Sequence, residues 1–287
     1  MRIRLRSKDG FTSGTLVADE RSRAAPLLVC IHGGGCNSGY FDIKGFSTVE
    51  AARRAGLSVL LVDRPGHAGN PLVEADRPIE AMAPIVRAFV DEVRGEHLDG
   101  SRDIVIIGHS IGGAVALTMA ADRGDWPLRA LAVSGIGDVP APEVIQWCSS
   151  ERAHEFPPAE AAASLFFGPE GTFGWQGPVA LRRTSEPWRV GEVVDVALDW
   201  PRRWPAIAAG IDVPVHLRLA EHDRIWETGE GVAARMADRL TRSPRVDAAL
   251  LAEGGHLYEI HKRGPELIAS QLEFLVESVA AESAAPD

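Results

Sequence analysis

Polar and apolar residues alternate at the start of the chain, and short apolar runs follow further along. Residues 2–7 place Ile3 and Leu5 between arginines, which is typical of a half-buried antiparallel strand. A second strand is predicted for residues 12–18. Later apolar runs are too short for isolated helices and rich in β-branched residues, so they predict buried strands. These runs are 26–31, 57–62, 104–107, 128–133, 213–219 and 246–251.

Between these strands, apolar residues recur at helical spacing. Residues 79–94 form the clearest amphipathic pattern, and Pro84 within it predicts either a kink or the true start of the helix. Further helices are predicted for 47–55, 113–121, 229–240 and 265–280. Alternating strands and helices predict an α/β fold with a mostly parallel central sheet, helices on both faces and an antiparallel hairpin at its entrance.

One interval is much longer than a plain crossover between strands requires. It separates the strands at 128–133 and 213–219, and it holds half of the chain's aromatic residues. We predict a helical lid (cap) subdomain at 139–207, inserted after the sixth strand, with 1–138 and 208–287 forming the core. Some of these aromatic side chains would form the subdomain's own core, and others would line an apolar pocket over the site. The aromatic residues are Trp147, Phe156, Phe166, Phe167, Phe173, Trp175, Trp188, Trp200 and Trp204.

The segment Gly108-His-Ser-Ile-Gly112 lies between the strand at 104–107 and the helix that follows. A strand that turns directly into a helix crowds the backbone around Ser110, and Gly108 and Gly112 remove the Cβ atoms that would collide. This context predicts an exposed nucleophilic serine, with the backbone N–H of Ile111 beside it at a helix N-terminus. The alternative is a glycine-rich strand-to-helix turn that carries an ordinary serine.

A nucleophilic serine needs a base, and the base needs an acid to orient it. His256 is the candidate base, because it follows the last strand in a Gly-Gly-His turn at the same sheet edge as the serine. Asp223 follows the preceding strand and is the favoured acid. Glu221 and Asp138 remain alternatives at that edge.

The run His32-Gly33-Gly34-Gly35 follows the strand at 26–31. Its glycines would let backbone N–H groups approach a substrate oxygen and supply the second half of an oxyanion hole. Gly34 is the favoured donor and Gly35 the alternative. Cys36 lies beside this run, but no base accompanies it in the sequence, so we interpret it as a bystander.

Composition narrows the range of partners and cofactors. The chain has 287 residues and a formal net charge of −10, which disfavours nucleic acids and anionic membranes as partners. We expect a soluble cytoplasmic protein, because the sequence shows neither a signal peptide nor a membrane-spanning run. Three cysteines give no disulfide framework. Histidines and acids lack zinc-site spacing, so we expect no metal and no cofactor.

Five motifs together resemble the α/β-hydrolase superfamily, over about residues 25–278. They are His32-Gly-Gly-Gly35, Asp63-Arg-Pro-Gly-His67, Gly108-His-Ser-Ile-Gly112, Glu221-His-Asp223 and Gly254-Gly-His256. The resemblance implies an α/β-hydrolase fold with Ser110 as nucleophile, His256 as base and Asp223 as orienting acid. It implies Gly34 and Ile111 as oxyanion donors. A serine at 110, rather than an aspartate, argues against the epoxide-hydrolase and haloalkane-dehalogenase branches.

These features predict a serine hydrolase that forms an acyl-enzyme on Ser110. The bond would be an ester, thioester or lactone of a small, largely apolar or aromatic substrate, with Gly35, Trp147 and Trp175 as substrate-binding candidates. Alternatives that use the same triad are amide or C–C bond hydrolysis, acyl transfer or a lyase reaction. A non-catalytic binding protein is a further alternative. The partner we expect is a small-molecule substrate, and the chain could also form a homodimer.

Overall fold

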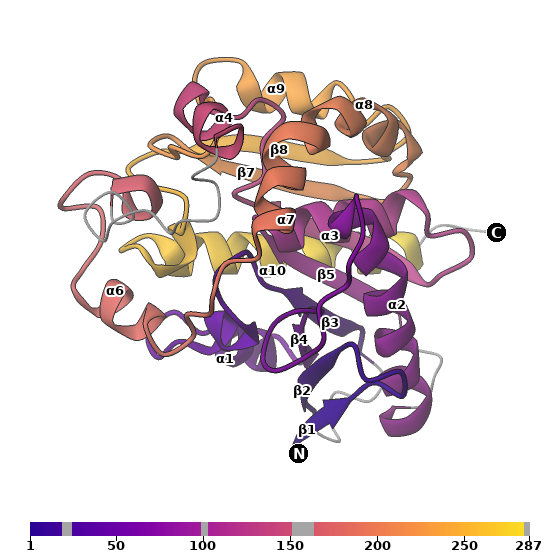
Figure 1. The fold of residues 1–287 in the computed structure, drawn as a ribbon. Helices are drawn as coiled ribbons and strands as arrows, with labels where there is room; N and C mark the ends of the chain where they lie inside the picture. The colour runs from indigo at the N-terminus through magenta and orange to yellow at the C-terminus, as the bar shows by residue number, and fades with distance from the viewer. Residues whose placement is uncertain (19–24, 99–102, 151–163, 284–287) are drawn as a thin grey trace.

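The computed structural model describes residues 1–18, 25–98, 103–150 and 164–283. Within these ranges the chain forms an eight-stranded sheet in the order β1-β2-β4-β3-β5-β6-β7-β8 (Figure 1). The pairs β1–β2 and β2–β4 are antiparallel, and all other neighbouring strands are parallel. The predicted α/β architecture, a mostly parallel sheet entered by an antiparallel hairpin, is therefore confirmed.

Every strand forms within about two residues of its predicted position. The strands are β1 (Arg2–Arg6), β2 (Ser13–Val17), β3 (Leu27–Ile31), β4 (Ser58–Asp63), β5 (Ile104–His109), β6 (Leu128–Ser134), β7 (Val215–Ala220) and β8 (Val246–Leu251). The helices outside the long interval are η2 (Ser38–Asp42), α1 (Thr48–Arg54), α2 (Pro78–His97), α3 (Ile111–Ala121), α9 (Val232–Ala237), η4 (Tyr258–Ile260) and α10 (Gly264–Ser283). Among the described residues, no helix combines the length and apolar character needed to cross a bilayer.

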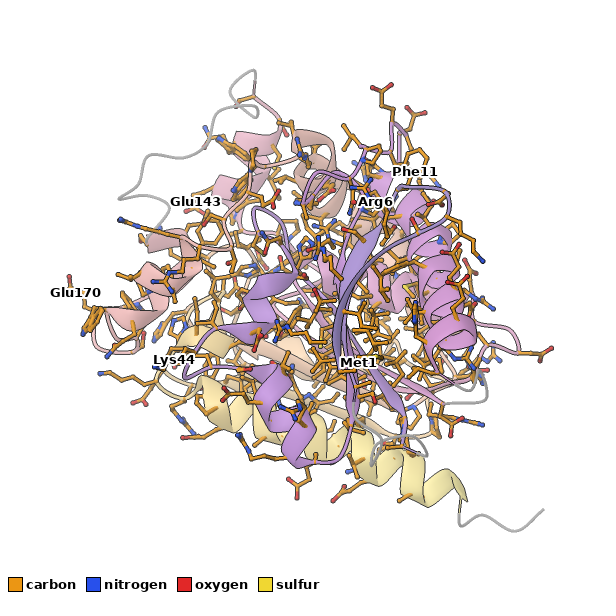
Figure 2. The ribbon with its side chains drawn as sticks, turned by 90° about the horizontal axis from the view of Figure 1, so that it is seen from below. Met1, Arg6, Phe11, Lys44, Glu143 and Glu170 are labelled. Atoms are coloured by element: carbon orange, nitrogen blue, oxygen red, sulfur yellow. The ribbon has the colours of Figure 1, made fainter. Side chains whose placement is uncertain are left out.

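The helices cover both faces of the sheet, as alternate residues of β3 illustrate. Leu27, Val29 and Ile31 join one buried cluster with side chains of α2, α3, α8 and α9. Leu28 and Cys30 join the cluster on the opposite face, with α1 and α10. Figure 1 shows α10 behind the sheet and α2 and α3 in front of it, and Figure 2 shows side chains filling the space between these layers. The helices on both faces thus hold the sheet rigidly under the loops at its edge.

Three predicted helix boundaries need correction. The helix α2 begins at Pro78 and runs through Pro84, so Pro84 does not mark its start. The helix α3 begins at Ile111 rather than at residue 113. The helix α9 is shorter than the predicted 229–240, because Gly231 at its start has a left-handed φ of 84° that breaks the preceding turn.

The strand order places a topological switch point between β3 and β5. From β3 the chain moves to β4 on one side and then to β5 on the other. Loops that leave the two strands at such a point diverge, which opens a crevice at the carboxyl edge of the sheet. The glycine run after β3 and the serine turn after β5 both lie at this crevice.

The long interval between β6 and β7, called the insert below, carries its own helices. These are α4 (Pro142–Cys148), α6 (Gln176–Leu181), α7 (Val190–Val194), η3 (Asp195–Asp199) and α8 (Trp200–Gly210). In α8, Trp200 and Trp204 are buried in the same cluster as α3, so these two aromatics serve the main core. Phe156 lies outside the described residues. The boundaries of a separate lid subdomain at 139–207 stay a prediction.

Candidate active site

Ser110 occupies a strained turn between β5 and α3. Its φ of 53° and ψ of −122° lie in a region that side-chain-bearing residues rarely adopt. The neighbouring glycines make this turn sterically feasible: a Cβ on Gly108 would lie 2.8 Å from the Gly112 carbonyl oxygen, and one on Gly112 would lie 2.1 Å from the Ile31 carbonyl oxygen. The turn therefore depends on both glycines.

His256 contacts both of its predicted partners. Its Nε2 lies 2.9 Å from Ser110 Oγ, and its Nδ1 lies 2.8 Å from Asp223 Oδ2. Because a carboxylate only accepts hydrogen bonds, Nδ1 carries the proton and Nε2 accepts from the serine hydroxyl. The other oxygen of Asp223 accepts from the backbone N–H of Ile225 at 2.8 Å, which fixes the carboxylate. A serine, a histidine and an acid thus meet at one edge of the sheet.

The two alternative acids contact other groups. Asp138 accepts two hydrogen bonds from Arg235, at 2.7 and 2.9 Å. Glu221 accepts from the backbone N–H of Glu253 at 3.1 Å. Asp223 is therefore the acid that the geometry brings to His256.

The glycine run after β3 lies against the serine turn. A Cβ built on Gly33 would lie 3.1 Å from Ser110 Cβ, and one built on Gly34 would lie 2.9 Å from Ile111 Cδ1. Gly35 has a φ of 67°, and its position abuts the indole nitrogen of Trp188, 2.7 Å from a built Cβ. The glycine run thus packs against Ser110 and against Ile111, the first residue of α3.

A buried arginine donates hydrogen bonds to the backbone of this run. Arg64, which follows β4, donates from Nε to the His32 carbonyl at 2.9 Å and from Nη2 to the Gly33 carbonyl at 3.0 Å. Its Nη1 donates to Glu192 Oε2 at 2.9 Å, and both side chains are buried. Burial raises the pKa of Glu192, but Arg64 and His67, through their charges and hydrogen bonds, together outweigh burial and the net shift is downward. Glu192 has no spacing signal in the sequence and was not predicted as a site residue.

A second buried acid, also missed from the sequence, lies beneath the serine turn. Glu259 accepts hydrogen bonds from Ser134 Oγ and from the Tyr40 hydroxyl, the latter at 2.8 Å, and its carboxylate lies 3.3 Å from His109 Nδ1. Burial raises the pKa of Glu259, but the adjacent His109 and the hydrogen bonds outweigh burial and bring the pKa to about 2. His109 is buried, and its ring stacks on that of Tyr40.

Cys36 is a buried thiol whose Sγ lies 3.9 Å from Nδ1 of the buried His32. Burial raises its pKa to about 12, and its Sγ lies 3.5 Å from the Gly33 carbonyl oxygen. Such a thiol stays protonated at neutral pH and is a poor nucleophile.

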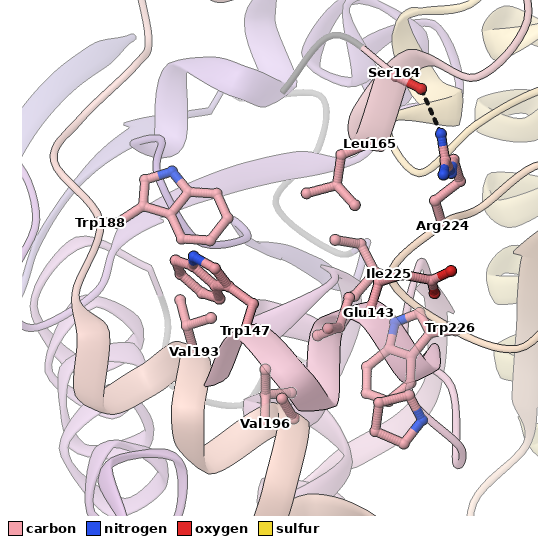
Figure 3. A pocket seen from close by; sticks show the side chains of 13 residues that line it. Glu143, Trp147, Ser164, Leu165, Trp188, Val193, Val196, Arg224, Ile225 and Trp226 are labelled. Atoms are coloured by element: carbon pink, nitrogen blue, oxygen red, sulfur yellow. Dashed lines mark hydrogen bonds between the residues drawn. The ribbon is translucent and has the colours of Figure 1, made fainter. Parts of the chain in front are cut away.

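A mostly apolar cavity of about 360 Å³ opens beside the site, between the insert and the loop that follows Asp223 (Figure 3). Trp147, Trp188, Leu165 and Ile225 point into it. Other lining residues are Pro140, Glu143, Val144, Ser164, Val193, Val196, Ala197, Arg224 and Trp226.

Of the three predicted substrate-binding residues, only Trp147 lines this cavity. Trp175 is 72% exposed and does not line this cavity, and its part in substrate binding stays a prediction. Trp175 directly precedes the short helix α6, whose buried residue is Gly177. Gly35 contributes only indirectly, because it supports Trp188.

The ring of Phe166 links the cavity to His256. Its centroid lies 6.1 Å from that of His256 and 5.6 Å from that of Trp188, which lines the cavity. Trp147 then packs edge-on against Trp188 at 6.1 Å. Ring contacts therefore connect His256, through Phe166 and Trp188, to Trp147 in the cavity.

Comparison with known proteins agrees with this fold. The family model described as "Alpha/beta hydrolase family" matches residues 28–269. A search of curated protein sequences finds no match.

Several solved structures are similar. A thermophilic esterase from Thermogutta terrifontis has a TM-score of 0.69 and 18% identity, covering 97% of this chain and 99% of its own. A monoacylglycerol lipase from Paleococcus ferrophilus has a TM-score of 0.65 and 21% identity, covering 89% and 96%. An enol-lactonase from Burkholderia xenovorans has a TM-score of 0.63 and 17% identity, covering 92% and 97%. At these identities the likeness concerns the fold.

Proposed function

The chain belongs to the alpha/beta hydrolase family, and from that premise we propose that it is a serine hydrolase that cleaves an ester or lactone bond through an acyl-enzyme on Ser110. The observation that carries the proposal is the pair of contacts made by His256, to Ser110 at 2.9 Å and to Asp223 at 2.8 Å. A binding protein would have no need of a base joined to both a hydroxyl and an orienting carboxylate.

In the proposed acylation step, Ser110 Oγ attacks the substrate carbonyl carbon as its proton passes to His256 Nε2. Asp223 accepts a hydrogen bond from Nδ1 and stabilises the imidazolium that forms. The carbonyl oxygen becomes an oxyanion, which the N–H groups of Gly34 and Ile111 stabilise. The intermediate then collapses: the bond from carbon to the leaving oxygen breaks, and that oxygen takes the proton from His256.

Deacylation repeats these roles with water as the nucleophile. His256 Nε2 takes a proton from water, the hydroxide oxygen attacks the acyl carbon, and a second oxyanion forms in the same place. When it collapses, the bond to Ser110 Oγ breaks and the serine recovers its proton from His256. The carboxylic acid leaves and the enzyme is restored.

The apolar cavity supports a small substrate with an apolar or aromatic part. Its volume of about 360 Å³ is at the lower end of the range for small-molecule sites, and its walls are mostly indole rings and aliphatic side chains. The esterase, lipase and enol-lactonase names of similar folds agree with an ester or lactone as the scissile bond.

A series of p-nitrophenyl esters with graded acyl chains tests the proposal. We expect turnover that depends on Ser110, and a kcat/KM that rises from acetyl to medium chains and then declines as the cavity fills. A Trp147→Ala variant should move the optimum toward longer chains, whereas Trp175→Ala, outside the cavity, should leave it unchanged. Equal rates for all chain lengths would contradict the assigned pocket, and no turnover of any ester would contradict the ester-hydrolase proposal.

A further inference from the structure

Arg64 and Glu192 form a buried ion pair between the core and the insert. Their side chains are 0% and 2% exposed, with Nη1 and Oε2 2.9 Å apart. Arg64 belongs to the loop after β4, and Glu192 belongs to α7 of the insert. Charged side chains are almost never fully buried unless they are paired. The buried His67 contacts both groups, because its Nε2 lies 3.3 Å from Arg64 Nη2 and 3.4 Å from Glu192 Oε2.

The other donors of Arg64 hold two successive carbonyl groups at the start of the glycine run. Nη2 donates to the Gly33 carbonyl at 3.0 Å, and Nε donates to the preceding carbonyl of His32 at 2.9 Å. Throughout the described residues the peptide bonds are trans. In a trans peptide the C=O of one residue and the N–H of the next point in opposite directions. The Gly33 oxygen also accepts from His32 Nδ1 at 2.8 Å, so Arg64 and this ring hold it together and direct the Gly34 N–H away from the guanidinium. Gly33 and Gly34 lie against Ser110 and Ile111.

The insert also contacts the far end of the same run. The backbone N–H of Glu186 donates to the Gly35 carbonyl at 2.8 Å. The N–H of Asn37 donates to the Thr184 carbonyl at 2.9 Å, and its side chain donates to Glu186 Oε1 at 3.0 Å. Gly34 thus lies between Gly33, which Arg64 and the His32 ring hold, and Gly35, which the insert contacts directly.

We propose that Glu192 is a positioning residue for the reaction: through Arg64 it sets the orientation of the Gly33–Gly34 peptide, so that the insert completes the oxyanion hole from outside the core. This inference rests on the proposed function. It gives the insert a part in transition-state stabilisation, in addition to forming walls of the cavity.

The test is a Glu192→Gln variant assayed with p-nitrophenyl butyrate. Glutamine keeps the size and an acceptor oxygen but removes the charge that holds Arg64. We expect kcat to fall at least about tenfold with KM within about twofold of the original, because the oxyanion contact forms only in the transition state. Phenylboronic acid, which forms a tetrahedral adduct with a serine, should bind more weakly by a similar factor.

Asp195→Asn is the matched control. Asp195 follows α7 on the same insert, is buried, and accepts from the backbone N–H of Ile79 at 3.0 Å and from Arg203, but its bonds do not reach the glycine run. We expect this variant to melt at a lower temperature with kcat within twofold of the original.

A double variant, Arg64→Met with Glu192→Met, removes both charges and avoids an unpaired buried ion. This double variant should fold even if Glu192→Gln does not. Its kcat should still be at least about tenfold below that of the original protein.

Two results would overturn the inference. One is an unchanged kcat in folded Glu192→Gln or in the double methionine variant. The other is a loss of kcat in Asp195→Asn as large as that in Glu192→Gln, which would indicate general loosening of the insert. Failure of the proposed function is distinguishable from both, because the unmodified protein would then turn over no ester.

Discussion

At the residue scale, the serine turn holds its side chain in place at an energetic cost. A non-glycine residue with a φ near 53° costs on the order of 1–3 kcal/mol and persists only where the surroundings enforce it. Here the close packing of Gly112 against the carbonyl of Ile31 enforces it. The hydroxyl is consequently presented to His256 before any substrate arrives, which reduces the reorganisation needed for attack.

The orienting acid gives the first prediction at this scale. Asp223→Asn should lower kcat/KM by about 10³–10⁴-fold, because an amide that donates to Nδ1 would favour the wrong tautomer of His256. Asp138→Asn, at the acid that pairs with Arg235 instead, should stay within a few-fold of the original. Steady-state kinetics of both variants would measure this. A larger loss in Asp138→Asn than in Asp223→Asn would contradict the assignment.

The sequence identified Ser110, His256 and Asp223 because each lies in a turn directly after a predicted strand. It could not identify Glu192 or Glu259, since an isolated acid between apolar residues looks the same whether it faces solvent or a buried partner. It also could not show that Trp175 lies outside the cavity, because an indole in an aromatic-rich segment gives no sign of which way it points. Side-chain direction in irregular segments depends on tertiary packing, and a local pattern does not encode it.

At the element scale, η4 joins several separate parts of the fold through Glu259. The carboxylate contacts Tyr40 of η2, His109 of β5 and Ser134 of β6. These contacts lie directly below the serine turn, so the position of η4, and of His256 just before it, depends on an ionised acid in the interior.

This dependence predicts a specific effect of pH on stability. Because the folded-state pKa of Glu259 is about 2, against 4.5 for the free group, its stabilising contribution is complete above about pH 4.5 and is lost as the pH falls toward 2. Between pH 7 and pH 3 the free energy of unfolding should fall by about 2 kcal/mol more in the original protein than in Glu259→Gln. Urea unfolding at the two pH values would measure this difference. Parallel pH dependences in the two proteins would refute it.

The strands were predictable because most are buried at every position and appear as short apolar runs, and α2 was predictable because burial of one face imposes a helical period on it. The short elements of the insert were not, because α4, α6 and α7 span only five to seven residues each. Their positions are set by contacts with the core, such as the ion pair of Glu192 with Arg64. The length of the interval and its aromatic content predicted an inserted segment. The positions of its helices are seen only in the structure.

At the scale of the whole molecule, the order of the strands brings together residues that are far apart in the sequence. Ser110 and His256 are separated by 146 positions, yet both follow strands of one parallel sheet and meet at its carboxyl edge. The glycine run joins them because β3 lies next to β5, at the switch point. The insert then closes one side of this edge, where it forms walls of the cavity and contacts the glycine run.

The central claim is that Ser110 is a nucleophile activated by His256, and covalent labelling tests it most directly. The folded protein would be treated with a fluorophosphonate and measured as intact protein and as peptides by mass spectrometry. We expect one adduct, on Ser110, that disappears in Ser110→Ala and forms at least about 100-fold more slowly in His256→Ala. Folded protein that acquires no adduct, or an adduct on another residue that persists in Ser110→Ala, would contradict it.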